Sequence, residues 1–152
     1  MKSYNLFILT LILSSILIIS CESSKSTQSK SDNLLSKITL EKVTMGSNSS
    51  LEITKDEILN ASNTRDGMGD ASKGATESKD WNKLNNLVSK LDLTQIDQWE
   101  GPTQARFYDG AKATTIIIES NGEIYNSQSF DEGQPPAELK ELYDYLESLV
   151  NQ

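Results

Sequence analysis

The sequence predicts an α+β fold, a two-layer arrangement in which helices pack on one face of an antiparallel sheet. Short segments alternate apolar and polar residues as half-buried strands do, and two longer segments repeat apolar residues at helical spacing. One Asp-Gly pair and one Asn-Gly pair, at 109–110 and 121–122, mark tight hairpin turns. We expect about 5–6 strands in the order β-β-β-α-β-β-β-α, forming one domain over residues 37–152.

Three strands are expected before the first helix. Apolar residues in 37–45 mark the first strand, and the Gly/Ser/Asn-rich stretch 46–50 reads as a turn. A short second strand follows at 51–54. A third strand begins near Ile58, although a helix capped by Thr54 is an alternative for this segment.

Residues 62–79 contain three glycines and many polar side chains, which predicts a long flexible loop. Three acids in this stretch fall at positions 1, 5 and 12 of an EF-hand loop: Asp66, Asp70 and Glu77. Ala71 occupies position 6, where calcium loops need glycine, and flanking helices are missing. We therefore expect a solvated loop, no metal site and no cofactor.

A first helix is expected over about 79–91, followed by a short helical turn from Thr94. Its apolar residues recur at helical spacing: Trp81, Leu84, Val88 and Leu91. Trp81 and Trp99 would suit a binding platform, but both are in register with aliphatic neighbours, which favours packing in the core.

The pairs Asp109-Gly110 and Asn121-Gly122 divide the next stretch into three expected strands, 104–108, 111–120 and 123–129. The second turn would pair Ile118 with Tyr125. One face would then collect these side chains: Ala105, Phe107, Thr114, Ile116, Ile118 and Tyr125. The unbroken run Ile116-Ile117-Ile118 suggests a central strand that is covered on both sides.

The last element is expected to be a helix that begins near Pro135-Pro136, because proline suits the first helical turn. Its apolar residues form one continuous stripe: Leu139, Leu142, Tyr143, Leu146, Leu149 and Val150. This stripe predicts a helix that lies against the sheet.

The N-terminal residues predict a bacterial lipoprotein signal peptide over 1–20. Lys2 precedes an apolar run from Leu6 to Ile19. As a helix this run would rise ~21 Å, which is too short to span a bilayer. Small Ser20 stands directly before Cys21, the only cysteine, so we expect cleavage there and acylation of Cys21, including palmitate. Residues 21–36 are polar and predict a disordered tether. A secreted protein with an unmodified cysteine is the alternative.

Composition limits the chemistry that the chain can perform. There is no histidine, and Cys21 is committed to lipid, which excludes Ser-His-Asp and Cys-His catalysis and histidine or thiolate zinc sites. The net charge of −8 makes nucleic acid an unfavourable partner. The acids would favour a basic protein or a cation, or they simply keep an envelope protein soluble.

Two short segments carry a resemblance to known proteins. Residues 106–111, Arg-Phe-Tyr-Asp-Gly-Ala, and 129–136, Ser-Phe-Asp-Glu-Gly-Gln-Pro-Pro, resemble the "R..DGA" and "FD.G.PP" segments of small uncharacterised lipoproteins of Bacteroidota. The resemblance implies a place in the cell envelope, at the outer membrane, and no particular activity. In proteins of this phylum, a surface-export signal would place several acidic residues soon after the cysteine. Here only Glu22 is acidic before Lys25, so the chain could face either the periplasm or the cell surface.

Three functions are in competition. The first is a non-catalytic binding or adaptor module for an envelope protein, with a candidate site at Arg106, Tyr108, Asp109 and Asp131. The competing interpretation of these residues is structural, with Arg106 in an ion pair with a turn carboxylate. The second function is an inhibitor or immunity-type lipoprotein against a basic enzyme. The third, less favoured, is a glycosidase that uses two carboxylates.

Overall fold

The structure is a computed structural model that describes residues 34–67, 69–108 and 110–150. These residues belong to the compact unit Asp32–Gln152. The expected signal peptide, Ser20, Cys21 and most of the expected tether lie outside the described residues. The first strand begins at Leu35, two residues before the expected start of the domain.

The described part contains one seven-stranded sheet in which all neighbours run antiparallel. Its strands are β1 (Leu35–Val43), β2 (Ser47–Thr54), β3 (Glu57–Thr64), β4 (Gly69–Ala75), β5 (Ala113–Ser120), β6 (Glu123–Asn126) and β7 (Phe130–Asp131). Their order in the sheet is β4-β3-β2-β1-β5-β6, and the short β7 also pairs with β5. The predicted α+β class is confirmed, with one more strand before the first helix than expected.

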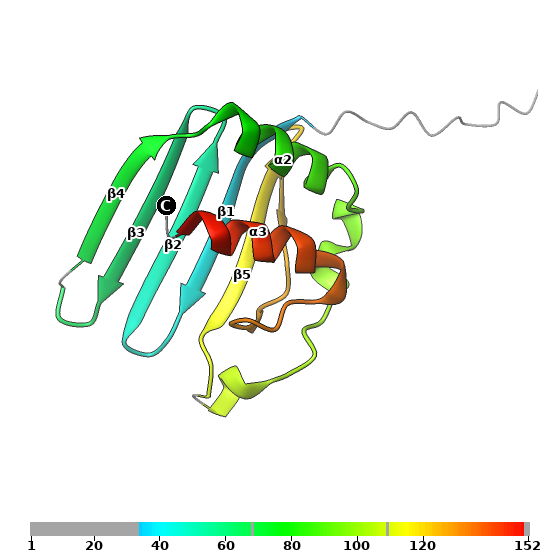
Figure 1. Ribbon diagram of the computed structural model, residues 1–152. Helices are drawn as coiled ribbons and strands as arrows, with labels where there is room; N and C mark the ends of the chain where they lie inside the picture. Colours follow the sequence, from blue (N-terminus) through cyan, green and yellow to red (C-terminus); the bar gives the residue numbers. More distant parts are fainter. Residues whose placement is uncertain (1–33, 68, 109, 151–152) are drawn as a thin grey trace, which may run out of the picture. The chain divides into compact units, whose positions relative to one another are not determined.

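Within the described residues, the helices are two α-helices and three short 3₁₀ segments. They are α2 (Ser78–Val88), η1 (Leu93–Gln98), η2 (Ala105–Tyr108), η3 (Ala137–Leu139) and α3 (Lys140–Val150). Figure 1 shows α2 and α3 on the same face of the sheet, in front of β1, β2 and β5. We call this the helix face and the other one the open face.

The core lies between the helix face and the two α-helices. On β1, Ile38 lies between Ile53 of β2 and Ile118 of β5. Leu40 lies in the same way between Leu51 and Ile116. All six side chains are at most 2% exposed, because alternation in three adjacent strands turns them toward the helices.

Both predicted helices are confirmed, together with the core role of the two tryptophans. Leu139, Leu142, Tyr143, Leu146 and Leu149 are buried, so the expected stripe of the last helix faces the sheet. Trp81 is 9% exposed and belongs to the core, and Trp99 is partly buried against it.

The β2–β3 hairpin resolves the alternative that the sequence left open at Ile58. β3 is a strand, and the Thr54 hydroxyl accepts a hydrogen bond from the Glu57 amide at 3.1 Å. This bond closes a turn at Lys55-Asp56 and does not cap a helix.

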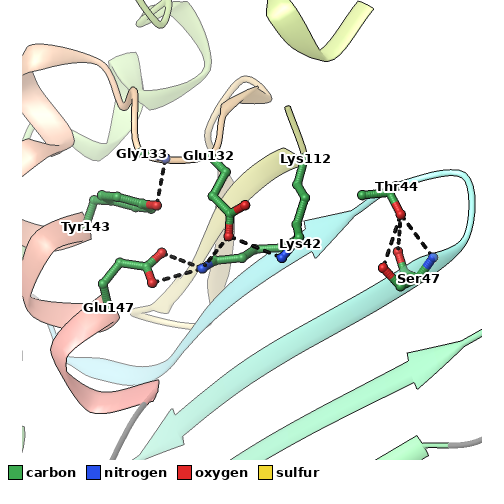
Figure 2. Close-up of polar contacts among 8 residues, drawn as sticks. All are labelled: Lys42, Thr44, Ser47, Lys112, Glu132, Gly133, Tyr143 and Glu147. Carbon is green, nitrogen blue, oxygen red and sulfur yellow. Dashed lines mark hydrogen bonds and ion pairs between the residues drawn. The ribbon is translucent and has the colours of Figure 1, made fainter. Parts of the chain in front are cut away.

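The turn expected at 46–50 is wrong, because β2 already begins at Ser47. The chain reverses at 44–46 instead, where Thr44 Oγ1 accepts from the amides of Gly46 and Ser47 at 3.2 and 3.0 Å. Figure 2 shows Thr44 and Ser47 facing each other across this turn. The serines after it are polar, but they pair with β1 and β3 and therefore extend the strand.

The long loop expected over 62–79 is also wrong. β3 continues to Thr64, and β4 follows at Gly69–Ala75, paired with β3 over its whole length. All seven residues of β4 are exposed. Because the strand buries no side chain, it shows no apolar alternation, and backbone pairing alone defines it.

The strand expected at 104–108 is wrong as well, because this segment is the 3₁₀ helix η2. Phe107 is 66% exposed and does not share the buried face of Thr114. The Asn121-Gly122 turn is confirmed, with φ values of 55° and 80° and Ile118 opposite Tyr125. β5 is buried on one face only, since Ile117 is half-buried on the open face.

Candidate functional site

A groove of about 630 Å³ lies at the end of the sheet where β1 ends and β5 begins. It is lined by the turn 43–46, by Arg106, by residues 110–113 and by Glu132. The turn and η2 lie at the same end of the sheet, below the labelled strands in Figure 1. We call this groove with its bordering residues the loop-end site.

Asp131, at the end of β7, fixes the backbone that borders the loop-end site. Its carboxylate accepts hydrogen bonds from Thr103 Oγ1 at 2.5 Å, from the Ala105 amide at 2.6 Å and from the Arg106 amide at 2.9 Å. A fourth bond comes from the Arg106 guanidinium at 3.1 Å. Asp131 is only 1% exposed, so these bonds replace the water that it loses on folding.

These contacts hold the pKa of Asp131 well below its ordinary value of 3.8. Burial alone would raise the pKa, because it disfavours the charged form. The bonds from Thr103, from the two backbone amides and from the Arg106 side chain outweigh that effect. Asp131 is therefore a permanent anion at neutral pH and is unsuited to giving or taking protons.

Arg106 has a structural role in this arrangement. Its Nη1 donates to Asp131 and, at 3.0 Å, to the Thr103 carbonyl, and its side chain is 13% exposed. The guanidinium carbon lies 4.4 Å from the centre of the Phe107 ring, within the range of a cation–π contact. The predicted ion pair with a turn carboxylate is thus confirmed, and the partner is Asp131.

The remaining predicted residues of the site divide into two cases. Tyr108 is 86% exposed at the end of η2, and Asp109 lies outside the described residues. The structure thus brings Arg106 and Asp131 into contact and leaves the Tyr108 side chain in solvent.

Exposed apolar side chains line the loop-end site or directly follow Arg106, which lines it. In the part of the chain that the structure describes, six large apolar side chains are exposed, and four of them are Val43, Met45, Phe107 and Tyr108. Met45 is 84% exposed. Phe107 is stacked on Arg106, which Asp131 fixes in turn, so the aromatic residue is presented on a rigid support.

A charged cluster beneath the loop-end site was not predicted from the sequence. Figure 2 shows Lys42 of β1 reaching between Glu147 of α3 and Glu132. Lys42 Nζ lies 2.7 Å from Glu147 Oε1 and 3.0 Å from Glu132 Oε1, and Lys112 Nζ lies 3.5 Å from the same Glu132 oxygen. Strand alternation could have indicated that Lys42 faces the helices, since it continues the series of Ile38 and Leu40 on the helix face of β1.

The charges of this cluster support one another. Burial lowers the pKa of Lys42, but hydrogen bonds to Glu147 and Glu132 outweigh it and raise the pKa overall. Burial alone would raise the pKa of Glu132, but Lys42 and Lys112 outweigh this effect and lower the pKa overall. Burial and the nearby Glu147 raise the pKa of Tyr143, whose hydroxyl accepts from the Gly133 amide at 2.9 Å. The raised pKa of Lys42 and the lowered pKa of Glu132 both favour the charged forms that an ion-pair connection requires.

The pKa shifts of Glu132 and Glu141 run opposite to the shift that the acid of a glycosidase needs. A glycosidase needs one acid with a raised pKa to protonate the leaving group. The pKa of Glu132 is lowered, and that of Glu141 is lowered by Lys83 and Lys90. Glu147 and Glu132 share Lys42 as their partner, so they form an ion-pair network and not an acid–nucleophile pair.

Comparisons with known proteins identify no family and no relative for this chain. A scan against models of protein families found no match, and a search of curated proteins found no significant relative. No helix in 34–67, 69–108 or 110–150 is long and apolar enough to cross a membrane. The same residues contain no group of three or more acidic or cysteine side chains placed to hold a metal ion.

Proposed function

We propose that this chain is a bacterial envelope lipoprotein, anchored in the outer membrane through acylated Cys21, whose folded domain binds another envelope protein without catalysis. The anchor is supported by the apolar run that ends at Ser20-Cys21 and by the polar stretch that follows it. Several acyl chains together give a firm attachment, because each buried methylene adds about 0.8 kcal/mol.

The observation that supports binding is the apolar border of the loop-end site. Exposed apolar side chains cost free energy in water, and a soluble domain rarely gathers them unless they are covered by a partner. Aromatic and methionine side chains are enriched at protein interfaces, where they carry much of the binding energy. Met45 lines the groove and offers this chemistry, and so do the exposed Phe107 and Tyr108, which directly follow the groove residue Arg106.

The position of the loop-end site suits a tethered module. The chain from Cys21 enters the sheet at Leu35, and β1 then runs for nine residues to Val43, which lines the groove. Nine extended residues span about 30 Å. The groove therefore lies at the opposite end of β1 from Leu35, where the tether joins the sheet. This position favours a partner in the aqueous phase over one within the bilayer.

The binding proposal is tested with the double variant Met45→Ser/Phe107→Ser. The full chain is expressed in its native bacterium, so that the lipid anchor is intact. Crosslinking followed by purification should yield a partner in stoichiometric amount from the unaltered chain and at least about tenfold less from the variant. The matched control is Ile124→Ser, which removes another exposed apolar side chain, on β6.

A partner that is lost equally from the control variant, or the absence of any stoichiometric partner, would contradict the proposal. If the captured partner is a basic enzyme whose activity falls on binding, and salt weakens the effect, the domain is an inhibitor or immunity protein instead of an adaptor.

The anchor is tested separately with Cys21→Ser. The unaltered chain should incorporate labelled palmitate and remain with the membrane fraction, whereas the variant should do neither. A Cys21→Ser chain that stays processed and membrane-bound would show that the cysteine is an ordinary residue.

A further inference from the structure

We propose that the outer edge of β4 is a docking edge, where an extended basic segment of another protein adds as a further strand of the sheet. Among the described residues, β4 ends the strand order and pairs with β3 alone. The edge strand leaves alternate backbone amides and carbonyls available for hydrogen bonds with a new strand. This surface is separate from the loop-end site.

The phase of the β3–β4 ladder identifies the available groups. The Thr76 amide donates to the Asp56 carbonyl at 3.3 Å, just beyond the pair Glu57–Ala75. In an antiparallel ladder, hydrogen-bonded and non-hydrogen-bonded pairs alternate. Even-numbered residues of β4 therefore bond to β3, and the backbone groups of Ala71 and Lys73 point outward.

Little on β4 blocks the approach of another strand. Its sequence is Gly-Asp-Ala-Ser-Lys-Gly-Ala, without proline and without a bulky apolar residue. Natural edge strands are usually protected by prolines, by bulges or by charged side chains, especially lysine. The lysine of β4, Lys73, is held on the open face by an ion pair with Glu57 at 2.5 Å, away from the helix face.

A groove of about 310 Å³ beside β4 would receive the side chains of the added strand. Its floor includes Ile58 and Leu149, and Gly74 forms part of its wall. A Cβ added at Gly74 would meet only Ile58 Cγ2, at an ordinary contact distance of 3.4 Å. The space above Gly74 can therefore accept an apolar side chain of the partner.

Charge indicates what the added strand carries. Asp70 belongs to β4 itself and forms no ion pair in the described part of the chain. Asp80 lines the groove, where its carboxylate accepts a hydrogen bond from the Tyr145 hydroxyl at 2.7 Å. The whole chain has a net charge of −8, so a second copy would be repelled. We infer a basic segment in which apolar residues alternate with lysine or arginine.

The decisive variant is Ala71→Pro. Proline is tolerated on an edge strand where the missing amide would face solvent, so the sheet should stay intact. The substitution removes one outward donor and places a ring in the path of the incoming strand. Ala71→Ser is the matched control, because it keeps the amide. Gly74→Val tests the groove independently by filling it.

The experiment uses the full chain in detergent micelles and a library of nine-residue peptides. Their even positions vary among apolar residues and their odd positions are lysine or threonine. Selected peptides should bind the unaltered chain and Ala71→Ser alike. They should bind Ala71→Pro and Gly74→Val about tenfold more weakly or worse. Amide exchange should slow at Ala71 and Lys73 on binding, while Ser72 changes little.

Three results would overturn the proposal: a library without binders, equal binding to Ala71→Pro, or binding without slowed exchange at Ala71 and Lys73. Slowed exchange that appears without peptide as protein concentration rises would assign the edge to a second copy and would also refute a basic partner.

Discussion

Asp131 determines the local structure of η2 through side-chain contacts that are distant in sequence. Ala105 and Arg106 lie 26 and 25 positions before it, and their amides both donate to its carboxylate. A strand at this place would use those amides for a neighbouring strand. The captured amides instead favour a tight helical turn, and this turn presents Phe107 and Tyr108 to solvent.

The pKa of Asp131 predicts how stability responds to acid. A carboxyl whose folded pKa is lowered contributes stability that is fully present above its unfolded value, here 3.8, and is lost as the pH falls through the folded value. Urea unfolding of the unaltered chain should therefore show falling stability from about pH 5 downward.

The Asp131→Asn variant isolates this contribution. It should be less stable at pH 7, with a melting temperature lower by roughly 5 °C or more, and it should lose less additional stability between pH 5 and pH 2. Asp144→Asn, at an exposed ion pair with Lys140, is the control and should follow the unaltered chain. Identical acid profiles for all three proteins would refute this account of Asp131.

At the scale of elements, Lys42 connects β1 to α3. Lys42→Met keeps the length of the side chain but leaves Glu147 and Glu132 without this cation. Breaking a buried ion pair costs about 3–5 kcal/mol, and the partial exposure of both glutamates reduces the expected loss of unfolding free energy to roughly 2 kcal/mol. Denaturant unfolding at pH 7 measures this loss.

Lys140→Met provides the comparison for that variant. Lys140 forms an exposed ion pair with Asp144, one turn further along α3. Loss of this pair should change the unfolding free energy by less than about 0.5 kcal/mol. Equal effects of the two substitutions would show that the position of Lys42 between sheet and helix has no special energetic role.

Prediction from sequence succeeded where periodicity or turn chemistry determines the element. The stripe in α3 and the Asn121-Gly122 turn both identified their structures correctly, because a buried helix face needs apolar residues and this turn needs positive φ. β4 was missed because it buries nothing, and η2 was missed because Asp131 determines it from outside its own segment.

The candidate site was predictable only in part. The pairing of Arg106 with an acid followed from residue type, but its partner and the cluster around Lys42 depend on which strands become neighbours. The groove that joins Met45 to Arg106 depends on the same tertiary arrangement, since these two residues are far apart in sequence.

At the scale of the whole molecule, protection should decrease across the sheet. β1 has a neighbour on each side and lies beneath the helices, whereas β4 is fully exposed and ends the sheet. Amide exchange should therefore be slowest at Ile38 and Leu40 and faster by about two orders of magnitude or more along β4. Uniform exchange rates across the strands would contradict this gradient.

The pairing of β1 with β5 also has a consequence for how the chain reaches its native state. β1 to β4 form successive hairpins from nearby residues, but Ile38 meets Ile118 across a long intervening segment. Closing that segment carries an entropy cost that is recovered only when the core between the sheet and both helices forms. We therefore expect the hairpins to assemble early and the joining of β5 to β1 to limit the folding rate.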